Sequence, residues 1–195
     1  MPEEIINIPK LGSLNIHYSL LPKYRGASPV ESAILNGEKE TGVTIQKMVY
    51  KMDAGEIIAQ EKTLIETTEL APELRTRLIK QGGELLVKTL NTPSASGTSP
   101  YIGGGWVGIK QDDSLATFCK KIKKEDGLID LNDDAVKNYN KFRAYAHWPR
   151  TFFFNKENKR IIITKAKLED GKFVIEKIIP EGGKEIPFNQ FTLTN

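Results

Sequence analysis

Cysteine and histidine are scarce in this sequence, and their scarcity narrows the chemistry that it can support. The 195 residues include one cysteine, Cys119, and two histidines, His17 and His147. A single cysteine cannot form an intrachain disulfide, and it suits a reducing compartment such as the cytoplasm. One cysteine and two histidines are also too few for the usual structural zinc sites. We therefore expect no metal site and a cytoplasmic location.

Long hydrophobic runs are absent as well. No apolar stretch approaches the length that crosses a bilayer, and the first residues, Met-Pro-Glu-Glu-Ile-Ile, lack the basic region of a secretory signal. We expect no association with membranes. The hydrophobic fraction of 39% and the charged fraction of 27% are typical of a folded globular protein. The net charge of +3 permits a polyanionic partner such as RNA without requiring one.

The first half of the chain has the pattern of an α/β domain. Apolar periodicity and punctuation by proline and glycine predict helices over residues 2–8, 27–35 and 68–90. A turn is expected at 40–42, and strands are expected over residues 13–17, 43–49 and 57–62. Gly82-Gly83 is expected to weaken the long helix locally.

The second half has the pattern of a small, mostly β domain. Proline, serine, threonine and glycine dominate residues 91–105, which is typical of a linker. Beyond it we expect a helix over 132–145 and short strands over 151–154, 160–167, 172–179 and 189–193, typical of a small antiparallel barrel or sandwich. The predicted division is a first domain over residues 1–92, a linker over 93–111 and a second domain over 112–195.

The strand predicted over residues 13–17 carries the pattern that points most clearly to chemistry. Alternate residues of a strand face the same way, so Asn15 and His17 project to one side of it. An amide and an imidazole at a strand end can together hold a carbonyl oxygen as it becomes negative. A lone histidine is more often structural, but this pair runs directly into a loop with proline and glycine, the usual place for binding groups. We therefore predict a functional pair.

Asp53 is the carboxylate that we expect to reach this pair. It lies in a loop between two predicted strands, which would return it across the sheet towards His17. A carboxylate there would fix the tautomer of the imidazole and help to order a water or an amine. The alternative, a plain turn aspartate, is the better interpretation of Asp53 taken alone. The functional assignment of Asp53 therefore depends on its occurrence together with Asn15 and His17.

Two groups of basic residues suggest contact with nucleic acid. Lys23 and Arg25 lie in a loop that could contact phosphates or stack on a base, and a solvated turn is about as good an interpretation. Lys120, Lys123 and Arg150 belong to a scatter of positive charge around the predicted β domain. Any single lysine most often belongs to a solvated face, but the clustering makes nucleic-acid contact a reasonable second interpretation.

Several motifs, in this order, resemble methionyl-tRNA formyltransferases. In the first half they are Asn15-Ile16-His17, the run from Ser19 to Gly26, the run from Glu40 to Ile45, and Met52-Asp53-Ala54-Gly55. The second half is similar to the C-terminal domain of the same family through the run from Lys120 to Gly127, Phe142-Arg143-Ala144-Tyr145 and Trp148-Pro149. The resemblance covers nearly the whole chain.

The resemblance implies a partial Rossmann-like formyltransferase domain followed by a small open, OB-like β-barrel. It implies transfer of a formyl group from 10-formyltetrahydrofolate to the amino group of methionyl initiator tRNA. Asn15 and His17 would polarise the formyl carbonyl and stabilise the oxyanion, while Asp53 would orient His17 and assist proton removal. A further motif would line the folate site, namely Ser19, Leu20, Leu21 and Pro22. Lys23, Arg25, Lys120, Lys123 and Arg150 would be candidates for contact with tRNA.

The chain also departs from the family pattern. Tyr18 stands where a glycine or proline is usual, Ala54 replaces a common threonine, and Glu56 a common aspartate. Family members carry an earlier part of the Rossmann-like domain, so this chain corresponds to the C-terminal two-thirds of such an enzyme. We expect weak or no activity from the chain alone. We also expect an unpaired apolar edge beside residues 13–17, and a monomer unless that edge pairs.

Two alternatives remain open. A folate-dependent formyltransferase that acts on a nucleotide-linked amino sugar shares the Asn, His and Asp residues and the Ser-Leu-Leu-Pro loop. A non-catalytic RNA-binding remnant is the alternative from a different class of protein.

Overall fold

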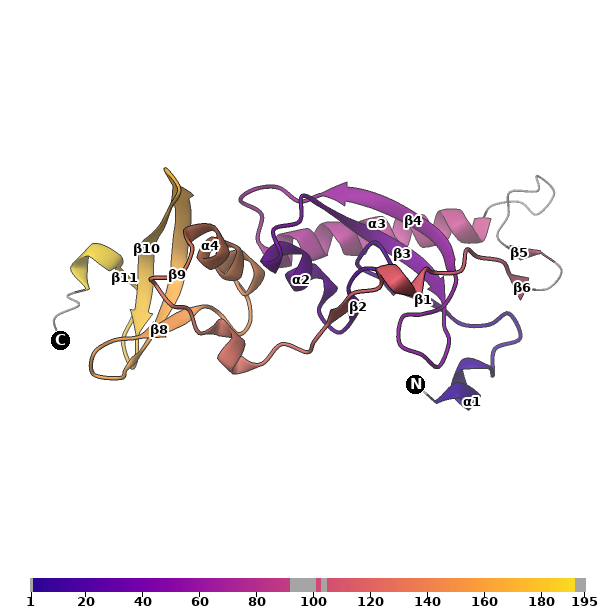
Figure 1. Ribbon diagram of the computed structural model, residues 1–195, viewed down its shortest axis with the longest axis horizontal. Coiled ribbons are helices and arrows are strands. Elements are labelled where there is room, and N and C mark those ends of the chain that lie inside the picture. Colours follow the sequence, from indigo (N-terminus) through magenta and orange to yellow (C-terminus); the bar gives the residue numbers. More distant parts are fainter. Residues whose placement is uncertain (1, 92–100, 103–104, 192–195) are drawn as a thin grey trace. The chain divides into compact units, whose positions relative to one another are not determined.

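The computed structural model describes residues 2–91, 101–102 and 105–191 (Figure 1). These residues fall into two compact units. The first comprises Met1–Ala33, Lys39–Ile65 and Leu74–Lys121, and the second comprises Ile34–Glu38, Glu66–Glu73 and Ile122–Asn195. None of the helices in these described ranges has the length and apolar character needed to cross a membrane.

The first unit is built on a three-stranded sheet with the order β1-β3-β4. Its strands are β1 (Leu14–His17), β3 (Glu40–Lys47) and β4 (Ile57–Leu64), which confirms the three strands predicted in this part of the chain. The register places Asn15 opposite Gln46 and His17 opposite Thr44. Both pairings are antiparallel, and residues 48–56 join β3 to β4. β1 thus lies at one edge of this sheet.

One predicted feature of this sheet is wrong. Glu40, Thr41 and Gly42 were expected to form a turn, and they are instead the first residues of β3. Gly42 is suited to a strand here because a Cβ at this position would lie 2.2 Å from the carbonyl oxygen of Glu61 and 2.6 Å from the Leu20 side chain. Glycine in a strand often marks such a close approach, which sequence patterns alone do not distinguish from a turn.

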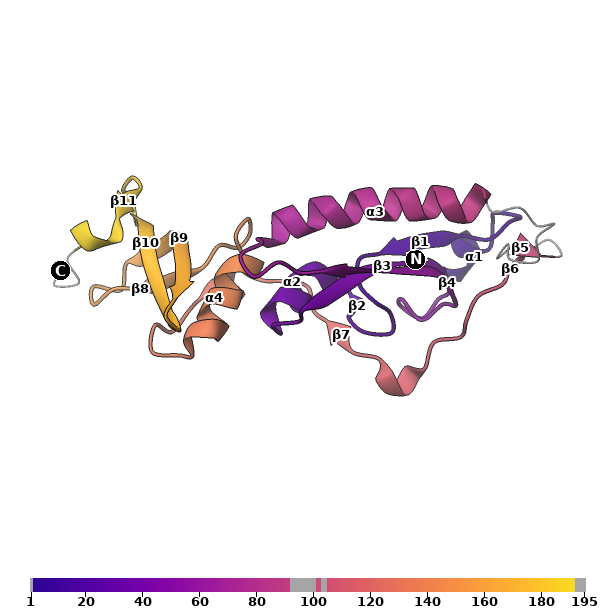
Figure 2. The ribbon, with the colours of Figure 1, turned by 90° about the horizontal axis from the view of Figure 1, so that it is seen from above.

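The long helix α3 (Ala71–Asn91) covers one face of this sheet (Figure 2). Gly82 and Gly83 do not interrupt it. Gly82 is buried where the helix crosses the sheet, and a Cβ there would lie 2.8 Å from Cγ2 of Ile16 and 3.2 Å from Cγ1 of Val43. Gly83 is exposed and nothing lies within 4 Å of its would-be Cβ. The two neighbouring glycines therefore differ: only Gly82 permits close packing of helix on sheet.

Shorter elements complete the first unit. The helices are α1 (Glu3–Ile6), α2 (Pro29–Leu35) and a 3-10 turn, η2 (Asp113–Leu115). The two-residue strands are β2 (Arg25–Gly26), β5 (Tyr101–Ile102), β6 (Gly105–Trp106) and β7 (Phe118–Cys119). β2 pairs in parallel with β7, and Ile109 forms an antiparallel bridge with Ile57. The segment before β7 therefore lies against the sheet that carries His17.

The predicted linker, residues 93–111, falls partly on residues 92–100 and 103–104, which lie outside the described residues. Of its remainder, β5 and β6 pair with each other, and Ile109 pairs with Ile57. The division into domains at residues 92 and 112 stays a prediction.

The second unit is a four-stranded antiparallel sheet with a helix packed on it. The strand order is β11-β10-β9-β8, with β8 (Phe152–Phe154), β9 (Arg160–Glu169), β10 (Lys172–Pro180) and β11 (Ile186–Pro187). The helix is α4 (Ala135–Ala144), and a 3-10 turn, η3 (Lys124–Gly127), precedes it. The core is built from aromatic and branched residues, namely Ile129, Tyr139, Phe142, Phe153, Ile161, Ile163 and Ile178. Among the described residues the sheet does not close into a barrel.

The strand predicted over residues 189–193 is wrong. The short strand β11 ends at Pro187, and Phe188–Gln190 form a 3-10 turn, η4. Proline has no N–H to donate to a neighbouring strand, which favours an end to pairing at this point. Residues 192–195 lie outside the described residues.

The two glycines of α3 provide a test of this packing. We expect Gly83→Ala to raise the free energy of unfolding by about 0.5–1 kcal/mol, because alanine is the better helix former and meets open space. We expect Gly82→Ala to lower it by about 1–3 kcal/mol, because the added methyl overlaps Ile16 and Val43. Urea denaturation of both variants beside the wild type measures the difference. Equal effects of the two substitutions would contradict this account of the helix.

Candidate active site

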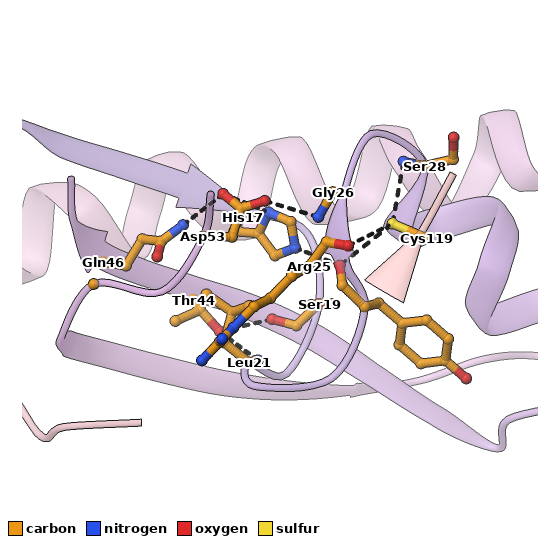
Figure 3. A network of polar contacts seen from close by, with 12 residues as sticks. His17, Ser19, Leu21, Arg25, Gly26, Ser28, Thr44, Gln46, Asp53 and Cys119 are labelled. Carbon is orange, nitrogen blue, oxygen red and sulfur yellow. Dashed lines mark hydrogen bonds and ion pairs between the residues drawn. The ribbon is translucent and has the colours of Figure 1, made fainter. Parts of the chain in front are cut away.

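His17 is buried at the end of β1, with 5% of its surface exposed. Its Nε2 lies 2.8 Å from the carbonyl oxygen of Tyr24. Its Nδ1 lies 3.7 Å from Oδ1 of Asp53. Figure 3 shows the two side chains next to each other. A carbonyl oxygen can only accept a hydrogen bond, so the network assigns the proton to Nε2. In the neutral ring Nδ1 therefore carries the lone pair, on the side that faces Asp53.

Asp53 approaches His17 from the loop between β3 and β4. Its backbone φ is +49°, in the left-handed region that aspartate adopts more readily than most residues. Its Oδ2 accepts a hydrogen bond from the amide of Gly26 at 2.8 Å, and its Oδ1 accepts one from Nε2 of Gln46 at 2.9 Å. The separation of 3.7 Å from His17 is too long for a hydrogen bond but short enough for a strong attraction once Nδ1 gains a proton.

Asn15 shares a cavity with Asp53. The cavity has a volume of about 410 Å³, and three polar residues, Asn15, Gln46 and Asp53, are among those that line it. The remaining lining residues are mostly apolar, namely Ile6, Met48, Val49, Tyr50 and Met52. This volume and this mixture of an apolar wall with a few polar groups are typical of small-molecule sites. The structure thus brings Asn15, His17 and Asp53 to one place.

The segment predicted to line a folate site is fixed to the sheet through Thr44. The Thr44 hydroxyl donates to the carbonyl oxygen of Ser19 at 2.6 Å, and accepts from the amide of Leu21 at 3.2 Å and from Nε2 of Gln60 at 2.8 Å. Gln60 also donates to the carbonyl oxygen of Leu21 at 3.0 Å. The side chains of Ser19 and Leu21 are buried, whereas Leu20 and Pro22 are half-buried. Side-chain contact with a ligand would therefore fall to Leu20 and Pro22.

Arg25 does not have the exposed position expected of a tRNA contact. Its side chain is 1% exposed. Its Nε and Nη2 donate to Oε1 of Gln111 at 3.1 and 2.7 Å, and Nη2 also lies 2.8 Å from Oδ1 of Asp113. Hydrogen bonds from Lys51 and then from Arg25 hold the pKa of the Asp113 carboxyl below its ordinary value. The expectation is corrected on this point, because a guanidinium committed to these partners presents no surface to a phosphate.

The other basic candidates have different exposures. Lys23, Lys120 and Lys123 are exposed, and Arg150 is half-buried. Lys120 belongs to the first compact unit and Lys123 to the second. Their contact with tRNA stays a prediction.

Cys119 is the one cysteine, and the loop beside His17 surrounds it. Its sulfur accepts from the amide of Ser28 at 3.3 Å and lies 3.4 Å from the carbonyl oxygens of both Tyr24 and Arg25. Burial raises the pKa of this thiol above its ordinary value, and the hydrogen bond from Ser28 offsets part of that rise. The thiol is therefore protonated at neutral pH, and a protonated thiol is a poor nucleophile.

Several residues of this site carry little or no signal of a functional role in the sequence. Thr44, Gln46, Gln60 and Gln111 are polar residues in strands or an irregular segment, where a polar side chain most often faces solvent. The alternation of β3 places Thr44 and Gln46 on one face, and that periodicity was the only available signal for those two. No arrangement of three or more His, Cys, Asp or Glu suited to a metal ion occurs within the described part of the chain.

Comparison with known proteins identifies the family. Residues 1–90 match the family model described as "Formyl transferase", and residues 121–186 match "Formyl transferase, C-terminal domain". The chain belongs to the formyl transferase family. A protein of Staphylococcus epidermidis named methionyl-tRNA formyltransferase is 42% identical over 180 residues, which are 90% of this chain and 56% of that protein. The chain therefore spans little more than half the length of that curated relative.

Solved structures share the fold. An N-formyltransferase from Helicobacter canadensis, in complex with folinic acid and dTDP-3-aminofucose, superposes with a TM-score of 0.66 at 22% identity, over 89% of this chain and 65% of that chain. The methionyl-tRNA formyltransferase from Clostridium thermocellum superposes with a TM-score of 0.61 at 21% identity, over 89% of this chain and 68% of that chain. At these identities the likeness establishes the fold alone.

The thiol of Cys119 reports whether the loop beside His17 is formed. At neutral pH we expect a thiol reagent to modify the folded chain at least about tenfold more slowly than the urea-unfolded chain, because the thiolate is the reactive form. Because folding raises the pKa of this thiol, it adds to the free energy of unfolding at pH values below the pKa of the unfolded chain, which is about 8.5. This contribution is lost as the pH rises through the pKa of the folded chain. Cys119→Ser gives the background rate. Equal rates in the folded and unfolded chains would show that the sulfur is not held as described.

Proposed function

We propose that this chain carries the catalytic residues for transfer of a formyl group from 10-formyltetrahydrofolate to the amino group of methionyl initiator tRNA, in the cytoplasm. The observation that supports this most directly is that Asn15 and Asp53 line one cavity and that Nδ1 of His17 lies 3.7 Å from Oδ1 of Asp53. The 42% identity to a protein named methionyl-tRNA formyltransferase supports this choice of acceptor. Because the chain spans 56% of that relative, full activity is proposed for the chain together with the portion that it does not span.

The geometry at His17 restricts how the ring can act. Nε2 is committed to the carbonyl oxygen of Tyr24, so only Nδ1 is free for chemistry. In the neutral ring Nδ1 carries a lone pair, so it can accept the proton that the attacking amine loses. Once protonated, the same atom can donate to the oxyanion of the tetrahedral intermediate and then give its proton to N10 of the folate as the bond between N10 and the formyl carbon breaks. The charge that the ring gains would then lie 3.7 Å from Oδ1 of Asp53, which would stabilise it.

Asn15 would supply the other donor. Its side chain lines the cavity, and its amide N–H can donate to a formyl oxygen as negative charge develops there. Asp53 is held by the amide of Gly26 and the side chain of Gln46, both neutral donors. No cation neutralises it through these contacts, and its negative charge faces the imidazole. The formyl group itself would come from 10-formyltetrahydrofolate, with Leu20 and Pro22 the side chains of the Ser19–Pro22 segment best placed to contact it.

An amino-sugar nucleotide is the alternative acceptor. The Helicobacter canadensis structure, solved with dTDP-3-aminofucose, supports this alternative only through its fold, because its identity to this chain is 22%. The same three catalytic residues would serve either amine. The geometry around His17 therefore does not distinguish the two acceptors, and an assay in which both substrates compete does.

The role of His17 can be tested against the second histidine of the chain. We expect His17→Ala to lower the single-turnover rate of formylation by about 100-fold or more, because it removes the general base, and to leave folate binding in place. The matched control is His147→Ala, since His147 is exposed and has no proposed role. The assay uses 10-formyltetrahydrofolate and methionyl initiator tRNA, with the chain alone and with a chimera that adds the part of the Staphylococcus epidermidis relative that this chain does not span.

Four results would count against the proposal. Preferential formylation of an amino-sugar nucleotide would show that this nucleotide, and not methionyl initiator tRNA, is the acceptor. Formylation of neither acceptor by the chimera would overturn the enzymatic proposal, and tRNA binding without formylation would favour an RNA-binding remnant. An unchanged rate in His17→Ala would remove His17 from the mechanism.

Lys120 and Lys123 allow a test of contact with tRNA. We expect Lys120→Ala and Lys123→Ala each to weaken binding of initiator tRNA and to reduce the slope of log affinity against log salt by about 1, as loss of one phosphate contact does. Filter binding over a range of salt concentrations measures the slope. Lys80→Ala, which removes an exposed lysine of α3, serves as the charge-matched control. A slope that responds to Lys80→Ala as strongly as to the other two would argue for a general charge effect instead of a defined contact.

A further inference from the structure

Gln111 connects the loop that carries Asp53 to the loop that carries Arg25 and Gly26. Its side chain is 6% exposed. Its Nε2 donates to the carbonyl oxygens of Asp53 at 2.8 Å and Gly55 at 2.7 Å. Its Oε1 accepts from Nη2 and Nε of Arg25 at 2.7 and 3.1 Å. The amide thus uses both of its donor hydrogens and both acceptor positions within the first unit.

The loop of Arg25 in turn contacts the carboxylate of Asp53. Arg25 is fixed by its side chain to Gln111 and by its backbone amide to the carbonyl oxygen of Thr117 at 2.8 Å. The next residue, Gly26, donates its amide to Oδ2 of Asp53 at 2.8 Å. Asp53 is therefore held twice. Gln111 binds its backbone, and the residue that follows Arg25 binds its carboxylate.

We propose that Gln111 and Arg25 form a positioning bracket that sets the distance between Asp53 and His17. The inference rests on the proposed function and adds to it two residues that touch no substrate. His17 is fixed separately, through Nε2 and the carbonyl oxygen of Tyr24 next to Arg25. The bracket thus ties both partners of the 3.7 Å contact to the same short loop. A catalytic pair needs support of this kind, because a displacement of about 1 Å can cost a large part of the rate.

Gln111 lies between the two ranges that match the family models, residues 1–90 and 121–186. The sequence predicts it to be the last residue of a linker. The antiparallel bridge between Ile109 and Ile57 explains how it reaches the site, because it lays this segment against the start of β4, beyond the loop of Asp53. The bracket is therefore a contribution of the connecting segment to the chemistry of the first unit.

The test replaces the amide of Gln111 without changing its size. Gln111→Met keeps the length of the side chain and removes all four hydrogen bonds, while Lys110→Ala changes an exposed neighbour as the matched control. The first readout is amide hydrogen exchange by NMR. We expect the amide of Gly26 to exchange about tenfold faster or more in Gln111→Met, because its acceptor Asp53 is no longer held. The amide of Ile163 in the second unit, bonded to the carbonyl oxygen of Thr151, should be unaffected.

The second readout is formylation by the chimera described above. We expect Gln111→Met to lower kcat by about tenfold or more, with the KM for methionyl initiator tRNA within about twofold of the wild type, since a positioning defect acts on the reacting geometry more than on binding. A purely structural role would lower the melting temperature and the amount of folded protein, and would leave kcat per folded molecule unchanged.

A second variant keeps the proposal testable if Gln111→Met does not fold. In Gln111→Glu the carboxylate can still accept from Arg25 but cannot donate to the carbonyl oxygens of Asp53 and Gly55. We expect faster exchange of the Gly26 amide in this variant too. Gly26 exchange and kcat that match those of Lys110→Ala would overturn the bracket. Faster Gly26 exchange in the Gln111 variants, together with a wild-type chimera that formylates no acceptor, would reject the proposed function and leave the bracket in place.

Discussion

The hydrogen bond between Nε2 of His17 and the carbonyl oxygen of Tyr24 is the contact on which the rest of the site depends. It fixes the plane of the ring and consumes the one N–H of the neutral imidazole. Nδ1 is thereby turned towards Asp53 as a lone pair. With the opposite tautomer, Nδ1 would carry the proton and could not accept one from an amine. A backbone carbonyl thus decides what the histidine can do.

The surrounding structure keeps that carbonyl in place. Thr44 holds the segment before Tyr24 with two hydrogen bonds, to Ser19 and Leu21, and the side chains of Gln111 and Cys119 contact Arg25 after it. Thr44 is completely buried and lies opposite His17 in the register of β1 and β3. The sheet therefore supports both the ring and the loop that orients it. Elements from distant parts of the chain converge on one short loop, and their hydrogen bonds satisfy several of the polar groups buried there.

Most elements of the fold could be predicted from local patterns. The strands β1, β3, β4, β9 and β10 and the helices α2, α3 and α4 lie within a few residues of the predicted ranges, because apolar periodicity of 2.0 or 3.6 residues reports which face is buried. The two wrong predictions came from local patterns, whereas the observed structure at those positions depends on contacts with other parts of the chain. Glu40–Gly42 resemble a turn until the approach of β4 is known, and the strand predicted over 189–193 does not account for Pro187 at the end of β11.

The sequence by itself determined the residue types of the site and their order: an amide and an imidazole on one strand face, and an aspartate in the following hairpin loop. It also determined the family, through motifs that need no structure to read. Only the tertiary structure decided the tautomer of His17, the burial of Arg25 and the participation of Gln111. The physical reason is that these properties depend on hydrogen bonds between residues far apart in the chain, such as Arg25 and Gln111 at a separation of 86 positions, and no local pattern records which buried groups will meet.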